Sequence, residues 1–126
     1  MSKVLIVEDE EKIRNLYKKM LTAEGIDVAE AENGEKAAMV LLQDKCIDLF
    51  LLDIHMPVVN GVSLFEAVRV FNPHAKVIVA SVYPLEDQKR MIHGADDYFD
   101  KAEGADVLVE RVKSALQPEA WKGACG

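Results

Sequence analysis

Five polar side chains follow apolar runs of strand length, and their types could act together in one site. Glu8 and Asp9 come directly after "KVLIV", Asp53 closes "LFLLD", Ser81 closes "KVIVAS", and Lys101 follows "DYFD". Taken singly, each has a structural explanation as an acid near a helix start, a turn acceptor or a surface charge. Together they predict a functional site, because the carboxyl ends of parallel strands meet at one edge of a sheet.

Glu8, Asp9 and Asp53 would need a positive charge between them. Two carboxylates 4 Å apart repel by about 4 kcal/mol at an effective dielectric constant near 20. Lys101 can offset one charge, and oxygen ligands without Cys or His indicate Mg²⁺, with Mn²⁺ as the alternative. A carboxylate beside such a cation, an ammonium and a hydroxyl is arranged to attack phosphorus. Asp53 is therefore a predicted phosphoryl acceptor.

The elements that must position these residues form a repeated strand and helix pattern. Strand-length apolar runs occur at residues 3–8, 26–31, 47–53, 76–81 and 95–101, with helical spacing between them. The alternation predicts an α/β fold, a parallel sheet covered by helices on both faces.

Apolar residues at helical spacing mark four of the intervening helices, and Asn33 is a predicted cap for the helix at 34–43. The stripes comprise Ile13, Leu16, Tyr17, Met20 and Leu21; Val62, Leu64, Phe65, Val68 and Phe71; Leu85, Gln88, Met91 and Ile92; and Ala105, Leu108, Val109, Val112 and Leu116.

The first, third and fourth strands are continuously apolar, as central parallel strands are, whereas residues 26–31 alternate like an edge strand. This favours the doubly wound order 2-1-3-4-5. In such a sheet, ligands bind outside the carboxyl ends of the strands, between strands 1 and 3.

Composition and charge narrow the class of protein. With 22 acidic and 15 basic side chains among 126 residues, the net charge of −7 disfavours direct binding to nucleic acid or to an anionic membrane. The start of the chain has no apolar run long enough for a signal peptide or membrane span, so we expect a soluble cytoplasmic protein. Cys46 and Cys125 have no metal-site or redox spacing, and we expect free thiols. We assign residues 1–117 to one domain and 118–126 to a C-terminal tail.

The motifs "VEDE", "LLDIHMPVVNG", "VIVAS" and "GADDYFDKA" occur in this order. In this combination the chain resembles the receiver domain of two-component response regulators, from residue 3 to about residue 117. The resemblance implies a flavodoxin-like (βα)5 fold with five parallel strands. It also implies a response regulator that is not an enzyme but promotes its own phosphorylation and dephosphorylation. No output domain follows in this sequence, so we expect a stand-alone receiver.

By this resemblance, Asp53 accepts a phosphoryl group from a histidine kinase or a phosphotransfer protein. Asp9 binds Mg²⁺ directly, Glu8 assists partly through water, and the backbone carbonyl of His55 completes the protein ligands together with Asp53.

The resemblance also assigns the switch. Ser81 would hydrogen-bond the phosphoryl group, Lys101 would pair with it, and Tyr98 would change rotamer on phosphorylation. A protein partner would then bind the face formed by the fourth helix, fifth strand and fifth helix. The chain would be a monomer or a phosphorylation-dependent dimer.

Three positions depart from the family pattern or vary within it. The family usually follows its lysine with a cis proline, but Ala102 follows Lys101 here, and a non-proline cis bond costs about 3 kcal/mol. Val82 stands where a small residue is common and could crowd the phosphoryl pocket. His55 occupies a variable position beside the attacking water.

Three other functions can be weighed against the sequence. A phosphatase with an aspartyl nucleophile, of the haloacid dehalogenase type, would carry a second Asp where His55 stands. A flavodoxin-type electron carrier would need a Ser/Thr/Gly-rich phosphate loop in place of "EDEEK". A degenerate receiver that is never phosphorylated is disfavoured by the intact acids, Ser81 and Lys101. The chain could also be a fragment of a longer regulator.

Overall fold

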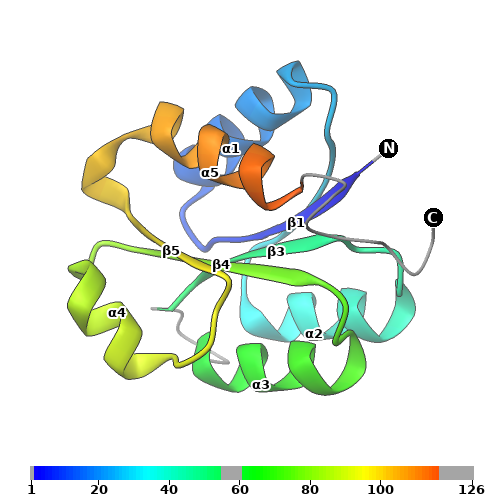
Figure 1. Cartoon of the computed structure of the whole chain (residues 1–126). Coiled ribbons are helices and arrows are strands. Elements are labelled where there is room, and N and C mark those ends of the chain that lie inside the picture. Colours follow the sequence, from blue (N-terminus) through cyan, green and yellow to red (C-terminus); the bar gives the residue numbers. More distant parts are fainter. Residues whose placement is uncertain (1, 55–60, 117–126) are drawn as a thin grey trace.

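The computed structural model describes residues 2–54 and 61–116, which form one parallel sheet with helices on both faces (Figure 1). The elements, in chain order, are β1 (Lys3–Val7), α1 (Glu11–Ala23), β2 (Asp27–Ala31), α2 (Gly34–Gln43), β3 (Leu49–Asp53), α3 (Gly61–Phe71), β4 (Lys76–Ser81), α4 (Leu85–Met91), β5 (Asp97–Asp100), the 3-10 turn η1 (Lys101–Glu103) and α5 (Ala105–Ala115). The five strands are parallel in the order β2-β1-β3-β4-β5. The predicted fold class and strand order are therefore confirmed.

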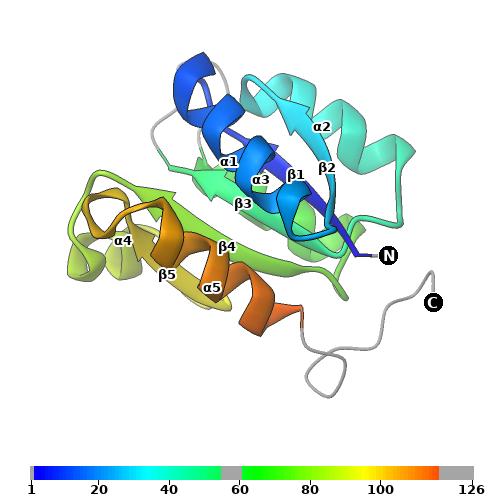
Figure 2. The same ribbon diagram turned by 90° about the horizontal axis from the view of Figure 1, so that it is seen from above.

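Both faces of the sheet are buried. Helices α1 and α5 cover one face, and α2, α3 and α4 lie on the other, which Figures 1 and 2 show from two directions. Leu5 and Val7 of β1 pack into the core beneath α2 and α3, whereas Val4 and Ile6 pack into the core beneath α1 and α5. Successive strand residues thus enter opposite cores, which explains why the central strands are continuously apolar.

The predicted helices are present, with small differences in what they bury. The side chain of Asn33 accepts a hydrogen bond from the Lys36 N–H at 2.9 Å, so the predicted cap of α2 is confirmed. In α1, Tyr17 and Leu21 are buried, but Leu16 is 47% exposed. The apolar stripe on α1 is therefore wider than the face that contacts the sheet.

Helix α3 begins directly against the end of β3. The Gly61 N–H donates to the Ile54 carbonyl at 3.2 Å. A Cβ atom at Gly61 would lie 2.7 Å from the Asp53 carbonyl oxygen, closer than van der Waals contact permits. Glycine is therefore needed at this position for α3 to approach the backbone that carries Asp53.

The fifth strand is shorter than predicted. β5 spans Asp97–Asp100, and Lys101 opens the η1 turn instead of ending the strand. Helix α5 ends at Ala115. The predicted boundary between domain and tail, at residues 117 and 118, lies outside the described residues.

Cys46 lies exposed in the loop between α2 and β3. It is disulfide-bonded, so the prediction of a free thiol is wrong for this residue. Cysteine spacing indicates metal and redox motifs, but it does not indicate which distant segments meet in the fold. Cys125 lies outside the described residues. Among the helices that the structure describes, none is long and apolar enough to cross a membrane.

Candidate functional site

The carboxyl-terminal edge of the sheet brings together the polar residues singled out in the sequence. Glu8 directly follows β1, Asp53 is the last residue of β3, Ser81 is the last residue of β4, and Lys101 directly follows β5. These strands are neighbours in one sheet, with β3 between β1 and β4. Side chains up to 93 residues apart in the sequence therefore meet, as Lys101 and Glu8 do.

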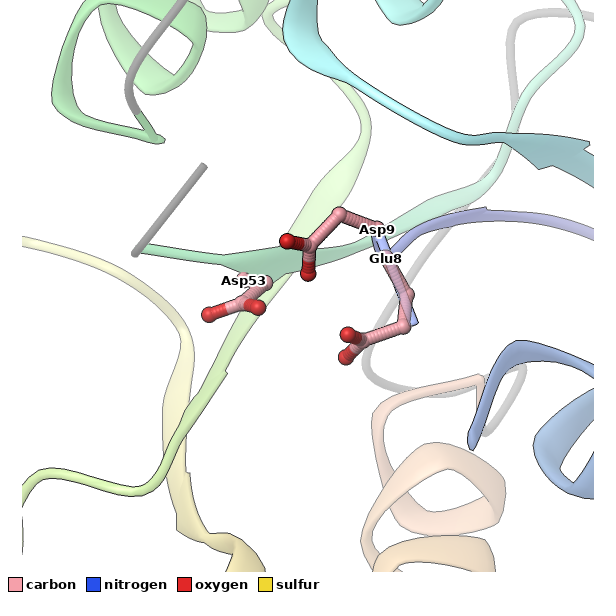
Figure 3. A group of neighbouring side chains, drawn as sticks. All are labelled: Glu8, Asp9 and Asp53. Atoms are coloured by element: carbon pink, nitrogen blue, oxygen red, sulfur yellow. The ribbon is translucent and has the colours of Figure 1, made fainter. Parts of the chain in front are cut away.

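Three carboxylates form the centre of this edge. Glu8, Asp9 and Asp53 each place one oxygen within 4.8 Å of the others, and Figure 3 shows the three groups turned toward a common space. Glu8 and Asp53 are buried, whereas Asp9 is exposed. Oxygens around an octahedral Mg²⁺ lie about 3 to 4 Å apart, given metal–oxygen distances near 2.1 Å. The cluster therefore fits a hydrated divalent cation after only small movements of the side chains.

Within residues 2–54 and 61–116, Lys101 is a cation that contacts this cluster. Its Nζ donates to Glu8 Oε1 at 2.6 Å and to Asp53 Oδ2 at 3.3 Å, and its side chain is only 11% exposed. Burial acts to lower the pKa of Lys101. The hydrogen bond to Glu8 and the charges of Asp53 and Glu8 outweigh burial, so the pKa is raised above its ordinary value. Lys101 is thus an ammonium at neutral pH, held between two carboxylates.

Glu8 is the inner carboxylate of the cluster. Burial raises its pKa above the ordinary value, and the hydrogen bond from Lys101 offsets this only in part. Its Oε2 accepts a hydrogen bond from the Glu10 N–H at 3.1 Å, and its backbone carbonyl accepts one from Arg14 Nη1 at 2.8 Å. Both carboxylate oxygens of Glu8 are therefore held by hydrogen bonds within this chain.

Ser81 is fully buried at the end of β4, next to the Asp53 strand. Its Oγ accepts a hydrogen bond from the Tyr83 N–H at 3.2 Å, which folds the start of the β4–α4 loop back onto the strand. Val82, between them, is 72% exposed. Most of its surface therefore faces solvent, and the crowding of a phosphoryl pocket by Val82 stays a prediction.

Tyr98 is half-buried on β5 and packs against the core beneath α2 and α3. Its hydroxyl donates to the Ile92 carbonyl at 2.7 Å and accepts from the Ala95 N–H at 3.2 Å. The Lys89 ammonium lies 5.9 Å from the centre of its ring. Tyr98 is thus anchored to the segment between α4 and β5.

The turn that carries Lys101 uses a different device from a cis proline. The peptide before Ala102 is trans, and Asp100 Oδ1 accepts a hydrogen bond from the Ala102 N–H at 2.9 Å. The Glu103 side chain in turn accepts from the Asp100 N–H at 3.1 Å, completing a capping box. Proline has no N–H to donate, so this turn depends on a residue such as alanine at position 102.

His55, the remaining predicted contributor, lies outside the described residues. Three residues with clear contacts at this edge were given no role at the site by the sequence interpretation: Arg14, Gln88 and Asp100. The spacing of Asp100 and Glu103 matches a capping box and could have revealed that turn. Gln88 was placed in an apolar helical stripe, where a polar residue is itself a signal, but no motif indicated the role of Arg14.

Comparison with known proteins decides the family. The response regulator receiver domain profile matches residues 4–113. The chain belongs to the response regulator receiver domain family. The transcriptional regulatory protein CpxR of Escherichia coli K12 is 34% identical over 124 residues, which cover 96% of this chain and 52% of CpxR. A cyclic di-GMP phosphodiesterase of Thermotoga maritima is 33% identical over 116 residues, covering 90% of this chain and 31% of that protein.

Solved receiver structures agree in fold. The Thermotoga maritima response regulator TrrA, in complex with Mg²⁺-BeF, superposes with a TM-score of 0.83 at 35% identity, covering 92% of this chain and 100% of that chain. A CheY-like receiver domain protein from Methanospirillum hungatei gives 0.82 at 28% identity, covering 92% and 94%. This receiver domain therefore belongs to two-component signal transduction, while it spans about half the length of CpxR.

Proposed function

We propose that Asp53 is the phosphoacceptor of this receiver domain. A carboxylate oxygen of Asp53 attacks the phosphorus of a phosphohistidine on a histidine kinase or phosphotransfer protein. The bond from phosphorus to imidazole nitrogen breaks, the imidazole takes up a proton, and an acyl phosphate remains on Asp53. The observation that carries this proposal is the position of Asp53, at the end of the central strand between two acids and a buried ammonium.

Each neighbouring residue has a proposed task. Lys101, already 3.3 Å from Asp53, pairs with the negative oxygens that arrive with the phosphoryl group. The Ser81 hydroxyl donates a hydrogen bond to one of these oxygens once the end of β4 moves toward Asp53. Neither group reacts covalently, so we propose a protein that promotes its own phosphorylation and dephosphorylation without being an enzyme acting on other substrates.

Asp9, Asp53 and Glu8 are the proposed residues that hold Mg²⁺, with Glu8 acting partly through water and the His55 carbonyl as a further ligand. When bound, the ion would neutralise charge on the phosphoryl oxygens during transfer. Two observations support this assignment: the three carboxylates converge, and the related TrrA was solved with Mg²⁺-BeF. Mn²⁺ suits the same oxygen ligands.

We further propose that phosphorylation alters the face formed by α4, β5 and α5, and that a protein partner binds there. The anchored position of Tyr98 supports this choice, because its side chain joins β5 to the end of α4. The chain would be a monomer that can dimerise when phosphorylated. We propose a cytoplasmic location, in keeping with the family's role in two-component signalling. Cell fractionation followed by immunoblotting tests that location.

The decisive experiment is intact-mass analysis after treatment with a small phosphodonor and Mg²⁺. The wild-type protein should gain one phosphoryl group that hydroxylamine removes. Asp53→Asn should gain none, and Asp48→Asn is the matched control because it alters an equally buried aspartate beside the opposite end of β3. Persistence of the modification in Asp53→Asn, with no new acceptor found by peptide mapping, would overturn the assignment.

A further inference from the structure

The carboxamide of Gln88 joins three backbone segments near the proposed phosphorylation site. Gln88 lies on α4 and is fully buried. Its Nε2 donates to the Tyr83 carbonyl at 2.8 Å and to the Phe99 carbonyl at 2.9 Å, and it lies 3.5 Å from the Ser81 carbonyl. The two short bonds use both amide hydrogens, and they connect the β4–α4 loop with β5 through one side chain.

The oxygen of the Gln88 carboxamide lacks the hydrogen bonds that its nitrogen has. Gln88 Oε1 is buried and has no hydrogen-bond partner among residues 2–54 and 61–116. A buried acceptor without a donor disfavours the arrangement that contains it. A movement that brought an N–H group to Oε1 would therefore be favoured. This gives Gln88 a physical reason to adopt a second arrangement.

Tyr83 is held on both of its backbone groups by residues of this link. Its N–H donates to Ser81 Oγ at 3.2 Å, and its carbonyl accepts from Gln88 at 2.8 Å. A displacement of the Ser81 hydroxyl toward Asp53 would therefore carry Tyr83 with it. That shift would change the bond between Tyr83 and Gln88, and with it the position of α4 relative to β5, which lie side by side in Figure 1.

We infer that Gln88 is a positioning residue that transmits movement of the Ser81–Tyr83 segment to α4 and β5. The route runs from Ser81 Oγ through the Tyr83 backbone to the Gln88 carboxamide and then to the Phe99 carbonyl. Tyr98, the next residue along β5, is anchored at the far end of α4 by its bonds to Ile92 and Ala95. Its environment would then change because α4 moves. This inference rests on the proposed phosphorylation of Asp53.

The test follows backbone NMR signals on addition of beryllofluoride and Mg²⁺, in the wild-type protein and in Gln88→Met. Methionine keeps the volume and shape of glutamine but cannot donate to the three carbonyls. In the variant, residues around Asp53 and Ser81 should respond as in the wild type, whereas the shift changes across α4 and β5 should fall by at least half. Gln43→Met, on the exposed end of α2, is the matched control and should respond fully.

A purely structural role for Gln88 would give a different result. Gln88→Met would then lower stability but leave the α4 and β5 response unchanged, which would overturn the inference. If the variant does not fold, the Gln88 side-chain amide signals of the wild-type protein give the answer. They should shift and exchange faster with beryllofluoride, and fixed signals beside a shifting Ser81 amide would also overturn it. If Asp53 itself takes up no phosphoryl group, the proposed function fails instead.

Discussion

Strand β3 has a buried aspartate beside each end, and the two have opposite surroundings. Asp48 immediately precedes the strand and Asp53 closes it, and each is 6% exposed. Asp48 Oδ2 accepts a hydrogen bond from the Lys3 N–H at 2.8 Å, and its own N–H donates to the Lys3 carbonyl at 2.9 Å. Asp53 instead shares the Lys101 ammonium with Glu8.

The difference shows that burial alone does not identify a functional aspartate. Asp48 closes a backbone hydrogen-bond network at the amino-terminal edge, so its carboxylate has a structural task there. At the carboxyl-terminal edge, three carboxylates converge, and among the described residues Lys101 forms ion pairs with two of them. Three acids that converge beside the Lys101 ammonium are a reason to expect a ligand of positive charge.

The largest effect on stability should come from removing the single ammonium. Lys101→Met should lower the free energy of unfolding by about 3 kcal/mol without divalent cations, because Glu8 and Asp53 lose their buried partner. Added Mg²⁺ should restore part of the loss, as urea unfolding can measure. Lys113→Met, which breaks an exposed pair with Glu24, is the control and should cost much less, because solvent screens that pair. Equal losses in the two variants would contradict the comparison.

A substitution of Asp48, beside the opposite end of β3, should lower stability by an amount that does not depend on Mg²⁺. Asp48→Ala should lower the free energy of unfolding by about 2 kcal/mol, since the Lys3 N–H loses its acceptor. The loss should be the same with and without Mg²⁺. Asp48→Asn retains an acceptor oxygen and should cost about half as much. A Mg²⁺-dependent cost for Asp48→Ala would mean that the two ends of β3 are coupled.

Removing one acid from the cluster of Glu8, Asp9 and Asp53 should change the free energy of unfolding less than Lys101→Met does. Without metal, it should stabilise the protein instead of destabilising it. Asp9→Ala should leave stability in a chelator unchanged or raise it by about 1 kcal/mol, because repulsion by Glu8 and Asp53 is relieved. The rise in melting temperature with Mg²⁺ should be largely lost. Glu66→Ala removes an exposed acid from α3 and should keep that rise. An unchanged Mg²⁺ response in Asp9→Ala would exclude this residue as a ligand.

The sequence predicts the features of this fold that depend on which residues are buried. Continuous apolar strands require cores on both faces, which implies a parallel sheet and places Asp53 and Ser81 at one edge. The end of β5 was missed because "YFDK" is compatible with either a longer strand or a capped turn. The partners of Gln88 and Tyr98 depend on how α4 packs, and periodicity does not specify which carbonyl a buried side chain reaches.

A substitution in the turn after β5 should change the free energy of unfolding by an amount similar to that for Asp9→Ala. Ala102→Pro removes the N–H group that donates a hydrogen bond to Asp100. It also disfavours the helical backbone conformation of Lys101. The free energy of unfolding without Mg²⁺ should fall by about 1 kcal/mol, because the Lys101 ammonium also shifts from Glu8. Ala102→Ser keeps the N–H and should be nearly neutral. A proline variant as stable as the wild type would show that the Asp100 cap contributes little.

The smallest effect concerns pH at the amino-terminal edge. The hydrogen bond from the Lys3 ammonium, with a further one from the Cys46 N–H, holds the pKa of Asp44 below its ordinary value. A lowered pKa in the folded state stabilises the protein above the unfolded-state value of about 3.9, and this stabilisation is lost as the pH falls through the folded-state pKa.

Asp44→Asn should therefore be less stable than the wild type at pH 7 by about 0.5 kcal/mol, since the pair is partly exposed. The difference should disappear in urea unfolding as the pH approaches the folded-state pKa of Asp44. Glu8 should show the reverse sign, because burial raises its pKa, so that ionising it at neutral pH opposes folding. Glu8→Gln measured in a chelator should thus lose less stability at pH 7 than at pH 4. If both variants followed the same pH trend, the two edges of the sheet would not differ electrostatically in the way that their contacts indicate.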